Sequence, residues 1–302
     1  MATVISIGEV MIELARGADG RFSQSSGGDT FNTAVYLARA GVDVAYATAL
    51  GDDPYSDAIR ASAQGEGIDT RLMKRVAGRM AGLYLIDTDP QGERTFSYWR
   101  DGTPARELFE LPGWEASCEA LIEANLIYLS GITLSLYSNT GLGRLLATLE
   151  FARERGTRIV FDGNFRPRNW KGDVTRARAV YAQALKRISI ALPTFEDEAL
   201  LWGDGSPGAT AERLATFGVE EIVVKNGARG ALVISRGTAQ QVPVPHPVDP
   251  IDTTAAGDSF NAAYLAARLV GQTPAAAAEA GHRLAGRVIR HRGALLPRTA
   301  NA

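Results

Sequence analysis

Strand-like and helix-like segments alternate with regular spacing through the second half of this chain. Short apolar runs predict strands at 125–130, 158–162, 188–192, 221–225, Gly230–Ser235 and Gln240–Pro245. Helical patterns predict helices at about 138–155, 174–186, 196–202, 209–217, 257–270 and 274–290. Strands linked through helices pair in parallel, because a parallel pair needs a long crossover connection. The alternation therefore predicts an α/β fold, with a central, mostly parallel sheet flanked by helices.

The first part of the chain adds strands of two kinds. Val4–Gly8 and Val44–Gly51 read as buried strands, each followed by a helical pattern that ends near Arg39 or Gln64. Two further alternating segments, 82–88 and 94–100, flank a turn at Asp89–Glu93. Strands joined by so short a turn are antiparallel, so we expect this hairpin outside the main sheet.

Composition excludes several classes of function. A chain of 302 residues, 45 % hydrophobic, can bury one large core. Its net charge of −2 gives no basic field for nucleic acid. Cys118 is the single cysteine and cannot form an internal disulfide, and three scattered histidines do not suggest a zinc site. With no basic leader and no apolar run near 18 residues, we expect a cytoplasmic protein without membrane contact.

A loop of small residues leads directly into the helix predicted at 257–270. Ala255, Ala256 and Gly257 leave their backbone N–H groups open to a bulky ligand, and the helix start adds a positive dipole. The loop is therefore suited to a phosphate or a phosphoryl transition state. Asp258 follows in the first turn, where a carboxylate is better explained as a proton acceptor than as a phosphate contact. The alternative is that Asp258 only caps the helix.

Two motifs together resemble those of the ribokinase-like (PfkB-type) sugar kinases. Asp252-Thr-Thr-Ala-Ala-Gly-Asp-Ser-Phe260 is similar to that family's Asp-Thr-x-Gly-Ala-Gly-Asp-x-Phe, with Ala255 where glycine is usual. Gly27-Gly28 with Asn32 resembles its Gly-Gly-x-x-x-Asn motif, although two glycines before a helix can also be a simple turn. The resemblance implies one ribokinase-like domain over 1–302, with a small β lid formed by about 9–26 and 82–101. It also implies ATP, Mg²⁺ and a sugar as ligands.

The resemblance implies roles for individual residues. Sugar contacts fall on Gly28, Asp29 and Asn32, with Asp258 as the base. The resemblance places a nucleotide-binding loop at Lys225, Asn226, Gly227 and Gly230, and the adenine contact at His282. The alternative for the loop is a plain hairpin. Thr194 would bind ATP and Asp197 would bind magnesium through water, unless this segment is simply a helix start. Asp252 would lie near a monovalent cation.

Two arginines point to an acidic sugar. Arg100 ends the second hairpin strand, and Arg166 follows a predicted strand. A guanidinium binds two carboxylate oxygens at once, although any one of 28 arginines can simply be solvated. Tyr-x-Arg, Arg-Pro-Arg-x-Trp and Pro-Thr-Phe-x-Asp-Glu resemble the branch of the family that phosphorylates 2-keto-3-deoxygluconate. Further contacts are expected from Tyr84, Tyr98 and Ile132.

These observations predict an ATP- and magnesium-dependent kinase that phosphorylates a primary hydroxyl of a sugar acid. Two alternatives stay open at this stage: a fructokinase or ribokinase that acts on neutral sugars, and a non-catalytic sugar or nucleotide sensor. The retained Asp258 and the complete anion loop favour a catalyst. We also expect a homo-oligomer, because exposed lid strands can pair between protomers.

Overall fold

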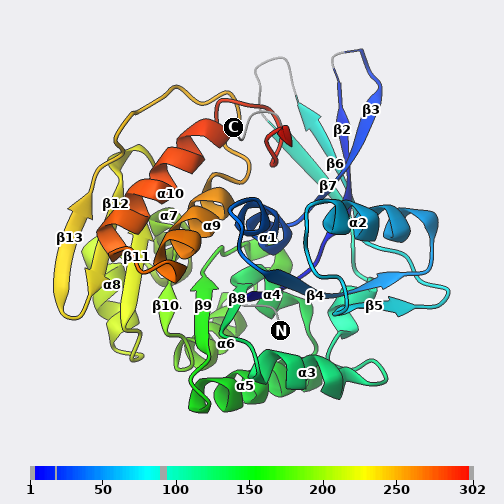
Figure 1. Cartoon of the computed structure of the whole chain (residues 1–302), viewed down its shortest axis with the longest axis horizontal. Helices are drawn as coiled ribbons and strands as arrows, with labels where there is room; N and C mark the ends of the chain where they lie inside the picture. The colour runs from blue at the N-terminus through cyan, green and yellow to red at the C-terminus, as the bar shows by residue number, and fades with distance from the viewer. Residues whose placement is uncertain (1–3, 18, 89–93, 299–302) are drawn as a thin grey trace.

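The structure is a computed structural model that describes residues 4–17, 19–88 and 94–298 (Figure 1). Within these residues the larger sheet has the strand order β13-β12-β11-β10-β9-β8-β1-β4-β5. The strands are β1 (Val4–Ile7), β4 (Val44–Gly51), β5 (Met73–Val76), β8 (Leu126–Ser130), β9 (Arg158–Asp162), β10 (Ile190–Ala191), β11 (Glu221–Lys225), β12 (Ala231–Ser235) and β13 (Thr238–Val242). Neighbours from β5 to β11 pair in parallel, and β12 and β13 are antiparallel. The predicted mostly parallel α/β sheet is confirmed.

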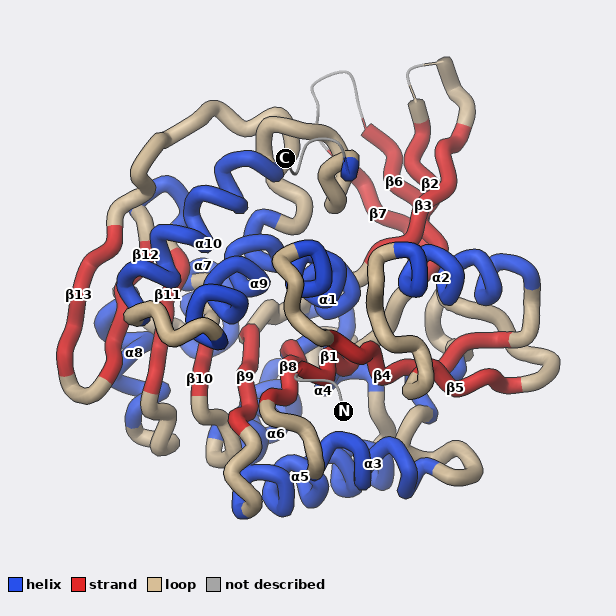
Figure 2. Tube along the Cα trace, in the orientation of Figure 1, coloured by secondary structure: helices blue, strands red, loops and turns tan. Residues whose placement is uncertain are grey.

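Helices cover both faces of this sheet, as Figures 1 and 2 show. One face packs against α1 (Asp29–Arg39), α2 (Pro54–Gly65), α9 (Ala256–Leu269) and α10 (Pro274–Val288). The other packs against α3 (Trp114–Ile122), α4 (Gly131–Leu136), α5 (Asn139–Glu154), α6 (Val174–Leu185), α7 (Phe195–Trp202) and α8 (Pro207–Ala215). The central strands are apolar on both sides because each face supports its own core.

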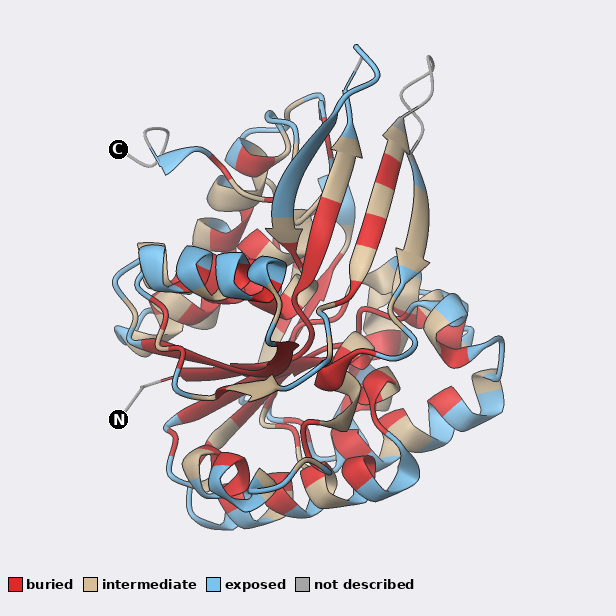
Figure 3. Ribbon diagram, turned by 90° about the vertical axis from the view of Figure 1, so that its right-hand side faces the viewer, coloured by how far each residue is buried: buried red, intermediate tan, exposed pale blue. Residues whose placement is uncertain are grey.

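A second, four-stranded sheet projects from the α/β body (Figure 3). Its order is β3-β2-β6-β7, formed by β2 (Met11–Arg16), β3 (Phe22–Gly27), β6 (Leu83–Thr88) and β7 (Arg94–Trp99). Two antiparallel hairpins join through the parallel pair β2–β6. These strands occupy the segments predicted for the lid, and the predicted turn at 89–93 lies outside the described residues. The edges β3 and β7 have no further strand partner in the described chain, and pairing between protomers stays a prediction.

Some element boundaries differ from the predictions for local reasons. β13 covers 238–242 rather than 240–245, because Arg236 and Gly237 both have positive φ and make a two-residue hairpin turn. β10 is only two residues long, although the apolar run extends over 188–192. The short helix α4 was not predicted; it begins at Gly131 behind a capping box of Ser130 and Thr133.

The fold brings the carboxyl ends of β1, β8, β9 and β11 toward the first turns of α1 and α9. In α/β sheets such ends form the ligand crevice. Polar residues from these ends lie within hydrogen-bonding distance of one another, as described below. Among the described residues, no helix is both long enough and apolar enough to cross a membrane.

Helices α9 and α10 depend on one glycine for their close packing. A Cβ added at Gly281 would lie 2.6 Å from a ring carbon of Phe260, whereas one added at Gly286, on the same helix, would meet nothing within 4 Å. We expect Gly281→Ala to lower the free energy of unfolding by about 1–3 kcal/mol, because overpacking shifts the two helices. Gly286→Ala is the matched control and should raise it by up to about 1 kcal/mol. Urea unfolding of both variants tests this, and equal effects would contradict the packing argument.

Candidate active site

The loop before α9 is held open by its own acidic residue. The Asp252 carboxylate accepts the backbone N–H of Thr254 at 3.0 Å and that of Gly293 at 2.7 Å. Ala255 then takes a left-handed conformation, with φ 59°, and α9 begins at Ala256. A Cβ added at Gly257 would meet only the Lys225 amine, at 3.4 Å. The loop amides therefore face open space at a helix start, as an anion site requires.

The first turns of α1 and α9 meet at Asp258. The Asn32 amide donates a hydrogen bond of 2.8 Å to Asp258 Oδ2, and the Thr33 hydroxyl donates to the Asp258 carbonyl at 3.2 Å. Asp29, also in the first turn of α1, accepts from the amide of Asn164 at 2.7 Å. The structure thus brings the predicted residues Asp29 and Asn32 together with Asp258, which is more than 200 residues away from both in the chain.

The two carboxyl groups influence each other's protonation. Withdrawal from water and the nearby Asp29 carboxylate raise the pKa of Asp258, the hydrogen bond from Asn32 opposes the shift, and the net result is a pKa of about 8. Burial also raises the pKa of Asp29, against hydrogen bonds from Ser130 and Asn164. A carboxyl whose pKa lies near neutrality can accept a proton from a hydroxyl and release it again.

The two glycines before α1 allow the lid and the body to approach closely. A Cβ on Gly27 would lie 2.1 Å from the Tyr84 hydroxyl, and one on Gly28 would lie 2.3 Å from the Glu9 carbonyl oxygen. Tyr84 donates its hydroxyl to Glu13, and its ring lies 5.7 Å from that of Tyr98. The predicted aromatic residues of the lid therefore form one surface beside the Gly-Gly turn.

The two predicted carboxylate-binding arginines each have an acidic partner within the chain. Arg100 is largely buried, with 11 % of its side chain exposed, and forms an ion pair with buried Glu9, yet its Nε has no hydrogen-bond partner among the described residues. Arg166 is half-exposed and donates to Asp197 at 2.8 Å. Each guanidinium would therefore keep a partner within the chain even when a neutral sugar is bound. What Arg100 lacks is an acceptor for its Nε–H.

Arg168 belongs to the same group and was missed in the sequence. Its guanidinium lies 5.2 Å from the centre of the Tyr98 ring and donates to the Phe96 carbonyl at 3.2 Å, so it connects the body to the lid. Arg100 also lies near Tyr98, at 5.9 Å. The repeated arginine in Arg166-Pro167-Arg168 was the available signal. Positive charge therefore gathers around one end of the lid's aromatic surface.

The predicted nucleotide loop follows β11. Asn226 accepts hydrogen bonds from the Arg229 guanidinium within the short 3₁₀ helix η3 (Gly227–Arg229), and Gly230 leads into β12. The side chain of Lys225 points into the protein, where its amine donates to Asp162 and Asn261, both at 3.0 Å. The backbone of this loop stays accessible for nucleotide contacts, while the Lys225 side chain belongs to a buried network.

The remaining residues predicted to contact ATP or sugar are His282, Thr194 and Ile132. His282 is buried on α10 with its ring 5.1 Å from Phe260, and burial lowers its pKa; its Nε2 has no hydrogen-bond partner. Thr194 precedes α7 without capping it, and its backbone bridges to Lys225. Ile132 lies partly buried on α4. Their contacts with ATP or sugar stay predictions.

The acidic residues of the cleft suit a magnesium ion that is held mainly by phosphates. The described residues contain no group of three acidic, histidine or cysteine side chains that could hold a metal. Asp162 offers a buried Oδ1 without a hydrogen-bond partner, and Asp197 offers the carboxylate that Arg166 binds. Magnesium keeps several waters and few protein ligands, so this sparse set fits it.

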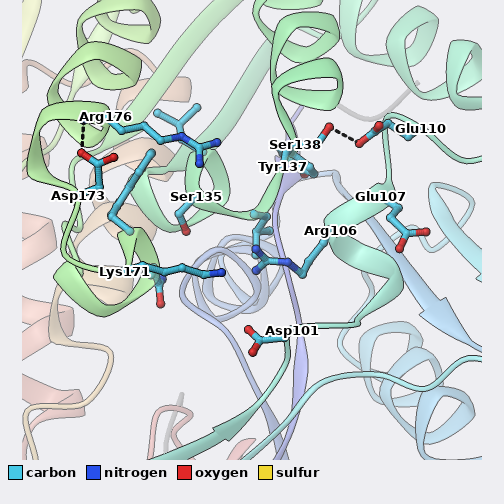
Figure 4. A pocket seen from close by; sticks show the side chains of 14 residues that line it. Asp101, Arg106, Glu107, Glu110, Ser135, Tyr137, Ser138, Lys171, Asp173 and Arg176 are labelled. Carbon is cyan, nitrogen blue, oxygen red and sulfur yellow. Dashed lines mark hydrogen bonds between the residues drawn. The ribbon is translucent and has the colours of Figure 1, made fainter.

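A cavity of about 450 Å³ lies apart from the predicted site (Figure 4). It opens between α4, α6 and the short helices η1 (Pro104–Glu107) and η2 (Pro167–Trp170). Its charged lining mixes both signs: Asp101, Glu107, Glu110 and Asp173 with Arg106, Lys171 and Arg176. None of the predicted site residues lines it.

Comparisons with known proteins agree with this geometry. The family model described as pfkB family carbohydrate kinase matches residues 1–301. The chain is 43 % identical over 299 residues to a 2-dehydro-3-deoxygluconokinase of Dickeya dadantii (96 % of each chain). It is 44 % identical over 303 residues to one of Escherichia coli K12 (97 % of each chain). Among solved structures, a PfkB protein from Polaromonas sp. JS666 matches with TM-score 0.86 and 25 % identity, over 96 % of each chain.

The left-handed Ala255 predicts a measurable strain. Alanine at positive φ costs about 1–2 kcal/mol, part of which glycine would return through the entropy of the unfolded chain. We expect Ala255→Gly to raise the free energy of unfolding by about 0.5–1 kcal/mol. Ala256→Gly, one residue later and helical, is the control and should lower it. Denaturant unfolding measures the free energy of unfolding of both variants. If only Ala256→Gly raises it, the argument that Ala255 is strained is wrong.

Proposed function

Since the chain belongs to the pfkB family of carbohydrate kinases, we propose that it transfers the γ-phosphoryl group of ATP to 2-keto-3-deoxygluconate. The product is 2-keto-3-deoxy-6-phosphogluconate. This substrate is also called 2-dehydro-3-deoxygluconate, and the relatives that are 43 % and 44 % identical are named for a kinase of it. The observation that carries the choice of an acid is the buried Arg100 guanidinium, whose Nε–H lacks an acceptor beside Tyr98.

The substrate would lie between the lid and the first turns of α1 and α9. Its carboxylate would accept from Arg100 and Arg166, and its chain would run along Tyr84 and Tyr98 toward Asp258. The lid would keep water out of the cleft and so limit hydrolysis of ATP. Gly28, Asp29 and Asn32 would hold the hydroxyls near the reacting end.

Asp258 would accept the proton of the attacking hydroxyl, while the amides of 255–257 stabilise the charge of the transferred group. The γ-phosphoryl bond to ATP breaks as the bond to the sugar oxygen forms, and the proton stays on the Asp258 carboxyl. Magnesium, when bound with ATP, neutralises phosphate charge there. Asn32 keeps the carboxylate aimed into the cleft through its hydrogen bond of 2.8 Å.

Removal of the proton acceptor tests the mechanism. Asp258→Asn keeps the size of the side chain and should lower kcat by about 10²-fold or more, with little change in ATP affinity. Asp249→Asn, an exposed acid a few residues earlier, is the matched control and should leave kcat unchanged. Steady-state kinetics and ATP titration measure both parameters. Near-normal turnover of Asp258→Asn would refute the base, and ATP binding without turnover in the wild type would indicate a sensor.

Substrate preference tests the proposed acid. A neutral sugar leaves the Arg100 Nε–H without an acceptor, at a cost of about 1–3 kcal/mol, so fructose and ribose should have kcat/KM values at least about tenfold lower. Arg166→Ala should reduce kcat/KM for 2-keto-3-deoxygluconate far more than for fructose. Arg155→Ala, which removes an exposed arginine side chain at the C-terminal end of α5, should change neither. If the wild type prefers fructose, the proposed substrate is wrong, although the assignment as a sugar kinase still holds.

A further inference from the structure

A buried lysine lies directly below the anion loop. Lys225 ends β11 and is 7 % exposed, with its amine 3.0 Å from Asp162 Oδ2 and 3.0 Å from Asn261 Oδ1. The same amine is the atom nearest to the position that a Cβ of Gly257 would take, at 3.4 Å. A full positive charge is therefore fixed beneath the backbone that faces the proposed phosphoryl group.

The acidic partner of this lysine is also buried and only partly satisfied. Asp162, at the end of β9, is 4 % exposed and accepts from the Asn261 amide at 2.6 Å as well as from Lys225. Its second oxygen, Oδ1, has no hydrogen-bond partner. A buried ion pair is seldom worth more than apolar side chains of the same volume, because both ions lose their hydration. Stability alone therefore does not account for this pair.

The pair is connected to Asp258 through short contacts. Asn261 lies one turn after Asp258 on α9 and donates to the Tyr128 hydroxyl at 2.9 Å. Thr33 donates both to that hydroxyl, at 3.3 Å, and to the Asp258 carbonyl, at 3.2 Å. The polar network thus runs from the ends of β9 and β11 to the first turn of α9.

The charges around Asp258 come from every neighbouring element. Asp29 on α1 and Asp162 on β9 raise its pKa, and Lys225 on β11 lowers it. The neutral hydroxyls of Tyr36 on α1, Tyr84 on the lid and Tyr128 on β8 also lie within its field. One ammonium group therefore stands against three carboxylates in a poorly hydrated cleft.

We propose that Lys225 and Asp162 are positioning residues that set the protonation of Asp258 from below, in opposite directions. The Lys225 ammonium favours the ionised, proton-accepting carboxylate, and the Asp162 carboxylate opposes it. This inference rests on the proposed role of Asp258 as the base. The pKa of Asp258 carries both influences, lowered by Lys225 and raised by Asp162, beside the larger effects of burial and Asp29.

The pH profile of kcat/KM tests this inference, because it reports the ionisation of the free enzyme. The base works only when deprotonated, so activity rises with pH through the pKa of Asp258. The part of the profile in which activity rises with pH is its acid limb. Lys225→Gln removes the stabilising charge and should move this acid limb to higher pH, by about one pH unit. Asp162→Asn should move it downward by about one pH unit. The double variant should return it close to the wild-type position.

Several outcomes distinguish this role from a structural one. Lys225→Arg keeps the charge and should keep the wild-type limb, even if kcat falls. Lower activity at every pH with an unmoved limb in Lys225→Gln would overturn the inference, as would shifts of the same sign in both single variants. If Asp162→Asn does not fold, the pH profile of Lys225→Gln alone still decides whether the inference holds. The matched control Lys186→Gln removes an exposed amine on the far end of α6 and should leave the profile unchanged.

The proposed function and this inference can fail separately. The profile is measured with whichever sugar the enzyme phosphorylates, so a different substrate leaves the test intact. Near-normal turnover of Asp258→Asn would remove the base, and with it the premise. A loss of turnover in Asp258→Asn together with an unmoved limb in Lys225→Gln would refute only the role of the buried pair.

Discussion

The hydrogen bond from Asn32 to Asp258 joins the first turns of two helices that lie on the same face of the main sheet. Because α1 and α9 pack side by side, their N-terminal ends lie next to each other, and both dipoles favour negative charge there. Two carboxylates, Asp29 and Asp258, occupy these first turns. The cleft therefore combines a surface for an anionic ligand with an acid that does not readily lose its proton.

This arrangement depends on glycines, which leave space beside the backbone because they have no side chain. Gly257 leaves room above the Lys225 amine, and Gly28 leaves room beside the Glu9 carbonyl. A Cβ at Gly28 would push apart the segments that meet there, whereas a Cβ at Gly257 would make an ordinary contact with the Lys225 amine and take up space in front of the loop amides. The polar side chains below the loop fill the remaining volume by bonding to each other, as buried polar groups must.

Local sequence patterns were sufficient to predict the main sheet and the helix that begins after the loop of small residues. Strands linked through helices pair in parallel, and a loop of small residues before a helical pattern can be recognised in consecutive residues. The direction of the Lys225 side chain could not be read in this way. It depends on Asp162 and Asn261, which reach the same point only after strands β9 and β11 and helix α9 are assembled. The Glu9–Arg100 pair was hidden for the same reason, since its residues are 91 positions apart in the printed sequence.

The buried pair of Glu9 and Arg100 also determines how the smaller sheet is attached to the body. Glu9 stands just before β2, where the chain enters this sheet, and Arg100 just after β7, where the chain leaves it. The chain also crosses between the body and this sheet after β3 and before β6, and Arg168 links the body to β7 through the Phe96 carbonyl. The ion pair is therefore one of several ties, and it holds the start of β2 to the end of β7 where the first and the last strand of the smaller sheet meet the body.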